Sequence, residues 1–415
     1  MQFSNSLWQY YVLSQISLRY YAMTHLDVIQ MKHSDDRILT THVGSLPRPE
    51  PLLEYFQRRQ AGEPIEDEGF EAAVREATEA AVARQDEIGI DVATGGEQGR
   101  LSFVTYVVDR LSGFDGEVPA IQWADLEEYP AYAEQVPTFK AWSEPGATIP
   151  AVTSPVEYVG EDATRAEYDA FQAAVDSTEA DFEEAFVTAA SPGTVTSYLG
   201  NEHYDSHEAF TDAVAAAIQQ EYELVADTGA VLQVDAPDLL GGRHLKFKDR
   251  TDDEFVEIAR YHVEALNRAL ENVPREQVRI HTCWGNYEGP HHHDIPLERV
   301  LPVLEDADVG GWLIEQANPC HQHDHVLLAE SGIPDDWVLV PGVIDVNVNY
   351  VEPPPVVADR IERFVDAVGD PTRVIAGADC GLGTFAGFGA LHPEIAWKKL
   401  ESLVEGAALA TERVF

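Results

Sequence analysis

The residues best suited to chemistry lie around position 281. His281 and Cys283 stand two residues apart at the end of a short β-branched run. On an extended strand, side chains two residues apart point to the same face, so the imidazole and the thiol converge. Two later apolar runs also end in ligand-type residues, at Glu315 and at Cys380. One imidazole, two thiols and one carboxylate suit a tetrahedral zinc site.

An ordinary core is the alternative for the same residues. A buried Cys is commonly a small apolar side chain, and a buried His is commonly a hydrogen-bonded one. The spacing of His281 and Cys283 alone therefore does not separate zinc from packing. The zinc interpretation depends on three separate strands that deliver ligand-type residues at the same end.

The elements that must position these residues follow a regular rhythm. Apolar runs and helical periodicity predict about eight strand–helix units, which are typical of a (β/α)8 TIM barrel. The alternative is a doubly wound open sheet, but no GxGxxG follows the first strand, which disfavours a dinucleotide fold. Strands are expected at 38–44, 91–94, 185–190, 231–235, around 281, at 309–315, 337–345 and 373–380, and helices at 70–88, 210–225, 253–270, 297–304, 356–368 and at the C-terminus.

In such a barrel, ligands collect at the C-terminal ends of the strands. The four zinc-ligand candidates fall there, and so do Gly44, Ser45, Glu97 and Asp235. Other interpretations remain for Ser45, Glu97 and Asp235. Ser45 is also explained as a turn residue, and the two carboxylates are also explained as ion-pair partners of Arg48 or Arg100.

Two segments stand outside the regular rhythm. Residues 1–36 are expected to be an extension that is disordered or not translated, because all three methionines (Met1, Met23 and Met31) fall there and translation could begin later. Residues 37–415 are then expected to form a single catalytic barrel. The stretch from about 113 to 183 is rich in Pro, Glu and aromatic residues, and is expected to be an excursion from that barrel.

The overall charge excludes some partners. The chain has 73 acidic and 27 basic residues in 415, a formal net charge of -46. Such an excess repels phosphate backbones and anionic lipids, so neither nucleic acid nor a membrane is an expected partner. The acids are interspersed rather than clustered, as in proteins of salt-accumulating halophiles; a merely acidic protein is the alternative. Three cysteines in so long a chain form no disulfide framework, which favours a cytoplasmic location.

Several motifs together resemble the catalytic barrel of cobalamin-independent methionine synthase. They occur in the same order along the chain from about Ile38 to the C-terminus, and cover only the catalytic half of the full-length enzyme. The resemblance implies a stand-alone barrel of the methionine synthase and uroporphyrinogen decarboxylase-like type, related to epoxyalkane:coenzyme M transferases. The motifs are residues 40–47, 96–97, 232–235, 281–283, 315 and 379–382.

The resemblance implies a role for each of these motifs. His281, Cys283, Glu315 and Cys380 would bind Zn²⁺. Glu315 would also be the ligand that the substrate thiol displaces, and Asp379 would join it as a catalytic residue. The expected reaction is methyl transfer to the thiol of homocysteine, giving methionine.

The same resemblance implies how the amino acid is held. Glu97 and Asp235 would bind the amine of homocysteine, and the loop at Gly44 and Ser45 would bind its carboxylate. Asn347 departs from the pattern, because folate-using methionine synthases carry a His near this position. An amide does not deliver a proton at neutral pH. The methyl donor is therefore expected to be either a folate or a methylcorrinoid protein, with the second favoured by Asn347.

Three alternatives stay open at this stage. Another thiol such as coenzyme M would need a cation such as Arg48 or Arg100 for its sulfonate. A non-catalytic zinc- or thiol-binding barrel would need the ligands but not the substrate groups. The histidine-rich segments 291–293 and 320–325 could form a second metal cluster or only a solvated loop.

Overall fold

The computed structural model describes residues 30–135, 146–387, 389 and 391–415. The expectation for residues 1–29 lies outside the described residues. The unit from Met31 to Phe415 is described by itself below. None of the described helices combines the length and the apolar content that a bilayer-spanning helix requires.

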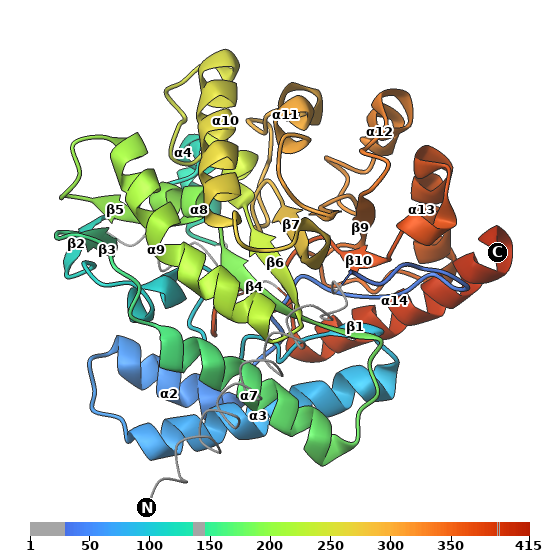
Figure 1. Cartoon of the computed structure of the whole chain (residues 1–415), viewed down its shortest axis with the longest axis horizontal. Coiled ribbons are helices and arrows are strands. Elements are labelled where there is room, and N and C mark those ends of the chain that lie inside the picture. The colour runs from blue at the N-terminus through green and yellow to red at the C-terminus, as the bar shows by residue number, and fades with distance from the viewer. Residues whose placement is uncertain (1–29, 136–145, 388, 390) are drawn as a thin grey trace, which may run out of the picture. The chain divides into compact units, whose positions relative to one another are not determined.

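Seven parallel strands form the central sheet of this unit (Figure 1). All of them follow the expected order, and sequential neighbours pair in parallel, with a register irregularity only between β9 and β10 among these strands. The strands are β1 (Val92–Ala93), β4 (Glu184–Ala190), β6 (Val231–Asp235), β7 (Val278–Thr282), β8 (Gly311–Ile314), β9 (Val338–Ile344) and β10 (Gly377–Ala378).

Residues 40 and 41 close this sheet into a barrel. Thr41 forms a parallel bridge with Val92 of β1, and Thr40 forms one with Ala376 beside β10. The backbone N–H of Thr41 donates to the carbonyl of Ala376 at 2.9 Å, and that of Val92 donates to the carbonyl of Thr40 at 3.0 Å. The (β/α)8 barrel is thus confirmed, and the doubly wound sheet is wrong.

The strand segment at residues 40 and 41 is shorter than the strand expected over 38–44. Gly44 adopts a φ of +138°, which takes the chain out of the strand direction. The His42 ring contacts the Gln85 side chain at 2.9 Å, and the bridges of this segment are at Thr40 and Thr41. The first position of the barrel is therefore joined to its neighbours by two isolated bridges rather than by the ladder of a full strand.

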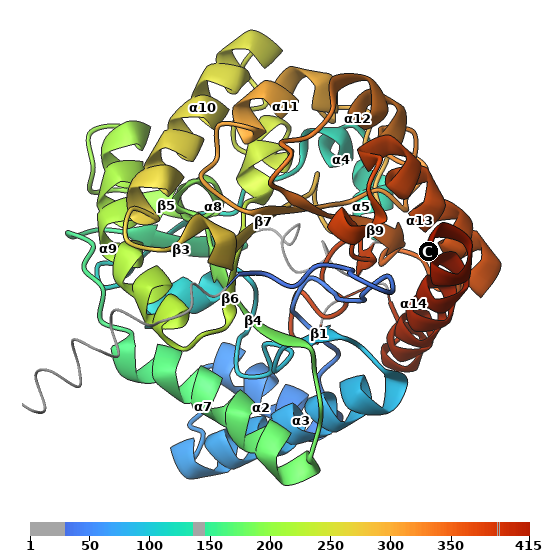
Figure 2. The same ribbon diagram turned by 45° about the vertical axis from the view of Figure 1, so that its right-hand side comes forward.

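Helices surround the strands, as Figure 2 shows. The expected helix at 70–88 is α3 (Asp67–Ile88), which ends at Gly89 in the left-handed conformation that favours glycine. The other helices are α2 (Glu50–Gln60), α7 (Glu161–Thr178), α8 (Pro192–Tyr198), α9 (His207–Asp227), α10 (Asp252–Ala269), α11 (Leu297–Leu304), α12 (His325–Ser331), α13 (Pro354–Val368) and α14 (Pro393–Val414). Short 3-10 turns lie at η1 (Thr105–Asp109), η2 (Pro237–Leu239), η3 (Gly241–Arg243), η4 (Arg275–Gln277) and η5 (Pro371–Arg373).

The stretch expected as an excursion divides into two parts. Its first part contains β2 (Gly116–Pro119), α4 (Ala124–Glu128), α5 (Pro130–Ala133) and β3 (Thr148–Val152). Strand β3 pairs antiparallel with β2 and parallel with β5 (Gly200–Asn201), so a small sheet forms outside the barrel. Its last part, α7, packs along α3 and leads into β4. Helix α7 is therefore a covering helix of the barrel.

The segment just before residue 37 packs on the N-terminal ends of the strands. Met31 is 5% exposed and clusters with Val92, Phe186 and Val231. The Ser34 hydroxyl donates to the carbonyl of Val374 at 2.7 Å. Residues 31–36 were expected to lie outside the barrel, but a flexible Met side chain fills the gap between three strands at this end.

Arg279 places a buried cation in the barrel interior. Arg279 of β7 is 1% exposed, and its Nε donates to Oε1 of Gln233 on β6 at 2.9 Å. Its guanidinium lies 4.2 Å from the centre of the Phe186 ring. Arg279 precedes His281 by two residues on the same strand face. The barrel interior directly below His281 therefore carries a positive charge.

Candidate metal and thiol-binding site

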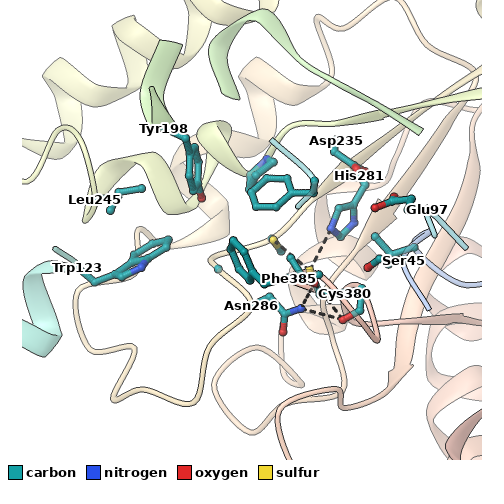
Figure 3. A pocket seen from close by; sticks show the side chains of 17 residues that line it. Ser45, Glu97, Trp123, Tyr198, Asp235, Leu245, His281, Asn286, Cys380 and Phe385 are labelled. Carbon is teal, nitrogen blue, oxygen red and sulfur yellow. Dashed lines mark hydrogen bonds between the residues drawn. The ribbon is translucent and has the colours of Figure 1, made fainter. Parts of the chain in front are cut away.

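Three ligand-type side chains meet at the C-terminal end of the barrel. The sulfur of Cys380 lies 3.7 Å from Nε2 of His281 and 3.8 Å from the sulfur of Cys283. His281 belongs to β7, Cys283 follows it directly, and Cys380 follows β10. All three are buried. Figure 3 shows the His281 ring pointing toward Cys380.

These distances fit one shared cation. Zinc bonds of about 2.3 Å to sulfur and about 2.0 Å to nitrogen place two tetrahedral sulfurs about 3.8 Å apart, and sulfur and nitrogen about 3.5 Å apart. The three free side chains already have this spacing. Burial lowers the pKa of His281 to about 3. The imidazole is thus neutral, which is the form that binds metals.

Glu315 does not join these three residues. It follows β8, but its Oε2 accepts a hydrogen bond from the backbone N–H of Trp284 at 3.1 Å and its Oε1 accepts one from Asn318 at 2.5 Å. The group whose ligand atoms lie within 4.8 Å of one another contains His281, Cys283 and Cys380 alone. Burial, and then the charge of Asp379, raise the pKa of Glu315 well above its usual range. Ligation by Glu315 stays a prediction that requires its carboxylate to turn away from Trp284.

Asp379 holds the loop that carries Glu315. Its Oδ1 accepts the backbone N–H groups of Gln316 at 2.8 Å and Ala317 at 2.6 Å, and its Oδ2 accepts that of Asn318 at 2.9 Å. It is not among the described residues that line the cavity. Asp379 therefore anchors this loop, and its expected catalytic role stays a prediction.

Two carboxylates share the cavity with the cysteines. Asp235 ends β6, and Glu97 lies after β1 with a positive φ of 55°. Thr188 donates to Oε1 of Glu97 at 2.8 Å, and Gln233 donates to Oδ1 of Asp235 at 2.9 Å. Oε2 of Glu97 is buried and accepts no hydrogen bond from the described residues. An acceptor left in this state favours a bound donor.

The nearby arginines form their close contacts with other groups than these two carboxylates. Arg48 donates to the backbone carbonyls of Glu97 and Arg100, at 2.8 and 2.6 Å. Arg100 forms its ion pair with Glu167 at 2.9 Å. The ion pairs found in the described chain include none between Arg48 or Arg100 and either Glu97 or Asp235. Burial, and then the charge of Glu97, raise the pKa of Asp235 well above its usual range.

The cavity has an acidic and sulfur-bearing side and an aromatic side (Figure 3). No lysine or arginine occurs among its described lining residues. The lining comprises Val43, Ser45, Glu97, Phe103, Trp123, Tyr198, Asp235, Pro237, Leu245, His281, Cys283, Gly285, Asn286, Cys380, Gly381, Thr384 and Phe385. Asp235, Glu97 and His281 lie together in the close-up view, whereas Trp123, Tyr198 and Leu245 lie on the other side.

Sequence reasoning missed the aromatic side. Trp123 comes from the excursion and Tyr198 from α8, and no pattern in either segment indicates a cavity. Asn286 could have been predicted from the sequence, since it ends the stretch that contains His281. Its amide donates to the carbonyl of Gly381 at 2.8 Å and to the Thr384 hydroxyl at 2.5 Å.

A second cavity adjoins the first. It shares Asn286, Gly381, Thr384 and Phe385 with the first cavity, and Asn347 and Arg48 line it as well. The position that departs from the methionine synthase pattern therefore faces a space next to the cysteines.

The chain matches the family model described as "Cobalamin-independent synthase, Catalytic domain" over residues 38–125 and 153–406. The chain belongs to this family. It is 28% identical over 375 residues to a methionine synthase of Thermococcus kodakarensis, covering 89% of this chain and 92% of that protein. It is 27% identical over 378 residues to one of Saccharolobus solfataricus, covering 90% and 95%.

A solved structure shows the same fold for a cobalamin-independent synthase. The B12-independent methionine synthase from Shewanella sp. W3-18-1, in complex with selenomethionine, aligns with a TM-score of 0.67 at 20% identity. The alignment covers 91% of this chain and 98% of that one. The family model skips residues 126–152, which lie in the excursion.

Gly44 provides a test of how closely this loop packs on the carboxylate. A Cβ at Gly44 would lie 2.5 Å from Oε1 of Glu97 and 2.7 Å from Cγ2 of Thr188. The control is Gly62→Ala, since Gly62 also has a positive φ but has nothing within 4 Å of its Cβ position. Gly62→Ala should cost about 1–2 kcal/mol for the backbone alone. Gly44→Ala should cost about 1–3 kcal/mol more, because of overpacking. Urea unfolding measures both, and equal losses would contradict the close contact.

Proposed function

We propose that this chain transfers a methyl group to the sulfur of homocysteine and so forms methionine. Membership of the cobalamin-independent synthase family and the methionine synthases among its relatives support the reaction. The observation that carries the proposal is one cavity that presents both the cluster of His281, Cys283 and Cys380 and the carboxylates Glu97 and Asp235. A sulfur-binding group and an amine-binding group are what an amino-acid thiol requires.

Different groups on the acidic side of the cavity bind the ammonium and the carboxylate of homocysteine. We assign the ammonium group of homocysteine to Glu97, whose Oε2 has no hydrogen-bond donor among the described residues, and to Asp235. We assign the carboxylate of homocysteine to the loop at Ser45, which lines the same cavity. The sulfur then lies at the cysteines.

His281, Cys283 and Cys380 are proposed to hold Zn²⁺, and Glu315 is proposed as the ligand that gives way to the substrate. Bound zinc would supply positive charge that favours the thiolate form of the substrate sulfur. The sulfur contributes an electron pair to the new carbon–sulfur bond, while the bond between the methyl carbon and the donor breaks with its pair on the donor. Trp123, Tyr198 and the other aromatic residues exclude water from the path of the methyl group.

The proposed methyl donor is a methylcorrinoid carried by a partner protein. Asn347 lines the adjoining cavity, and its amide cannot deliver a proton to a leaving folate nitrogen. A corrinoid leaving group needs no such proton.

The acidic surface also points to a saline cytoplasm, where a net charge of -46 keeps a protein hydrated and soluble. Assays therefore belong in concentrated KCl.

The test of the reaction offers both donors separately. Zinc-loaded protein is incubated with homocysteine and either methylcobalamin or methyltetrahydrofolate, and methionine is followed by mass spectrometry. We expect methionine from methylcobalamin only, and a strongly reduced rate for Cys380→Ser because one of two thiolate ligands is lost. Cys320→Ser is the control, since Cys320 is exposed and outside the cluster. Methionine from neither donor, with zinc bound, would reject the assignment and direct the assay to coenzyme M.

The role of Glu97 is tested by removing its charge. Glu97→Gln should raise KM for homocysteine about 10- to 100-fold, the value of one charged hydrogen bond of about 1.5–3 kcal/mol. The same variant should leave KM for 4-mercaptobutyrate, which lacks the amine, nearly unchanged. Glu298→Gln, at an exposed position on α11, controls for the change of net charge. Equal loss for both thiols would show that Glu97 supports the fold rather than the amine.

A further inference from the structure

We propose that His291, Asp294 and His321 form a second cation site, which binds one divalent transition-metal ion beside the cysteine cluster. These residues come from the two histidine-rich segments that the proposed reaction does not use. Nδ1 of His291 lies 3.0 Å from Oδ2 of Asp294, and Nε2 of His321 lies 2.8 Å from the same oxygen. Their ligand atoms all lie within 4.8 Å of one another.

The far nitrogen of each imidazole faces an oxygen, and that of His291 is hydrogen-bonded to it. Nε2 of His291 lies 3.1 Å from the carbonyl of Tyr287, and Nδ1 of His321 lies 3.5 Å from Oδ2 of Asp324. An imidazole that donates its N–H to such an oxygen keeps a lone pair on its other nitrogen, as in most protein metal sites. In both histidines the other nitrogen is the one that faces Asp294. Two imidazole nitrogens thus converge on one carboxylate oxygen, and a bound metal ion would take the place of the protons that join them.

A third histidine adds a buried nitrogen to the same carboxylate. Nδ1 of His244 lies 3.3 Å from Oδ1 of Asp294, and the His244 side chain is 1% exposed. Neither atom makes a hydrogen bond within the described chain. An inward-facing nitrogen and oxygen left in this state fit a site that a ligand completes.

The backbone also supports a built site. His291 has a φ of +56°, a left-handed conformation that is costly for a residue other than glycine. Ligands that share a metal at about 2.0–2.2 Å lie about 3.3 Å apart, so each imidazole nitrogen needs to move from the Asp294 oxygen by only about half an ångström or less.

The ion would fix the loop that orients Glu315. The His321 ring stacks on Trp284 with 3.4 Å between ring centres and 6° between planes. Trp284 donates its backbone N–H to Glu315 and its indole N–H to the carbonyl of Ile295, next to Asp294. Imidazole and carboxylate ligands without thiolate suit Zn²⁺, Co²⁺ or Fe²⁺. The second ion is therefore a positioning element for the first site.

Metal counting tests this site without any methyl-transfer assay. Protein carrying no histidine tag is loaded with Zn²⁺, dialysed and analysed by plasma mass spectrometry. We expect two ions per chain in the unmodified protein and one in each of Asp294→Asn and His321→Gln. The matched control is His292→Gln/His293→Gln, which removes two exposed imidazoles beside Glu128 and should retain two ions.

Co²⁺ loading assigns the ions to their sites. Thiolate-to-cobalt absorption should persist in Asp294→Asn and disappear in Cys283→Ser/Cys380→Ser, which should retain one cobalt with nitrogen and oxygen ligands only. One ion in the unmodified protein and none in the double cysteine variant would overturn the proposal. Loss of the second ion in His292→Gln/His293→Gln alone would overturn it too, because the ion would then belong to the surface cluster. Circular dichroism confirms the fold of each variant, and His321→Gln replaces Asp294→Asn if the latter unfolds.

Discussion

The contact of Cys380 with His281 and Cys283 is the interaction on which the site depends. Residues 281 and 380 are 99 positions apart, yet their side chains come within 3.7 Å. This happens because parallel strands place their C-terminal ends at one end of the barrel, and because residues 40 and 41 join the first strand to the last. Without that closure, β7 and β10 would lie in an open sheet with β8 and β9 between them, and their ends would not face each other.

The charge distribution of the site follows from the same geometry. Glu97, Asp235 and Glu315 are buried carboxylates near two thiols, and Arg279 is the buried cation in the barrel below them. The charge of Arg279 acts with burial to keep the His281 imidazole neutral. So much buried negative charge is costly unless cations or hydrogen bonds compensate it. The metal that we propose at the cysteines and the ammonium that we propose at Glu97 are two cations that would compensate this charge.

Much of this arrangement was predictable from the sequence. Strand endings marked by Asp235, His281 and Cys380 are local signals, and barrel topology converts them into a shared location. Other features depend on tertiary contacts that no local pattern records. The orientation of Glu315 is decided by the backbone N–H of Trp284, and that of Asp379 by three N–H groups of another loop. Trp123 reaches the cavity from a segment whose composition indicated only irregular structure.

The direct test of the central claim is the number of protons released when homocysteine binds to the zinc-loaded protein. A free thiol with a pKa of about 8.5 is mostly protonated at pH 7, so capture as a thiolate must release a proton. Calorimetric titration in buffers of different ionisation enthalpy gives the count. We predict close to one proton per chain for the unmodified protein and close to none for Cys283→Ser/Cys380→Ser. Tight binding of homocysteine to the zinc-loaded protein without proton release would contradict a sulfur-activating site at these three residues.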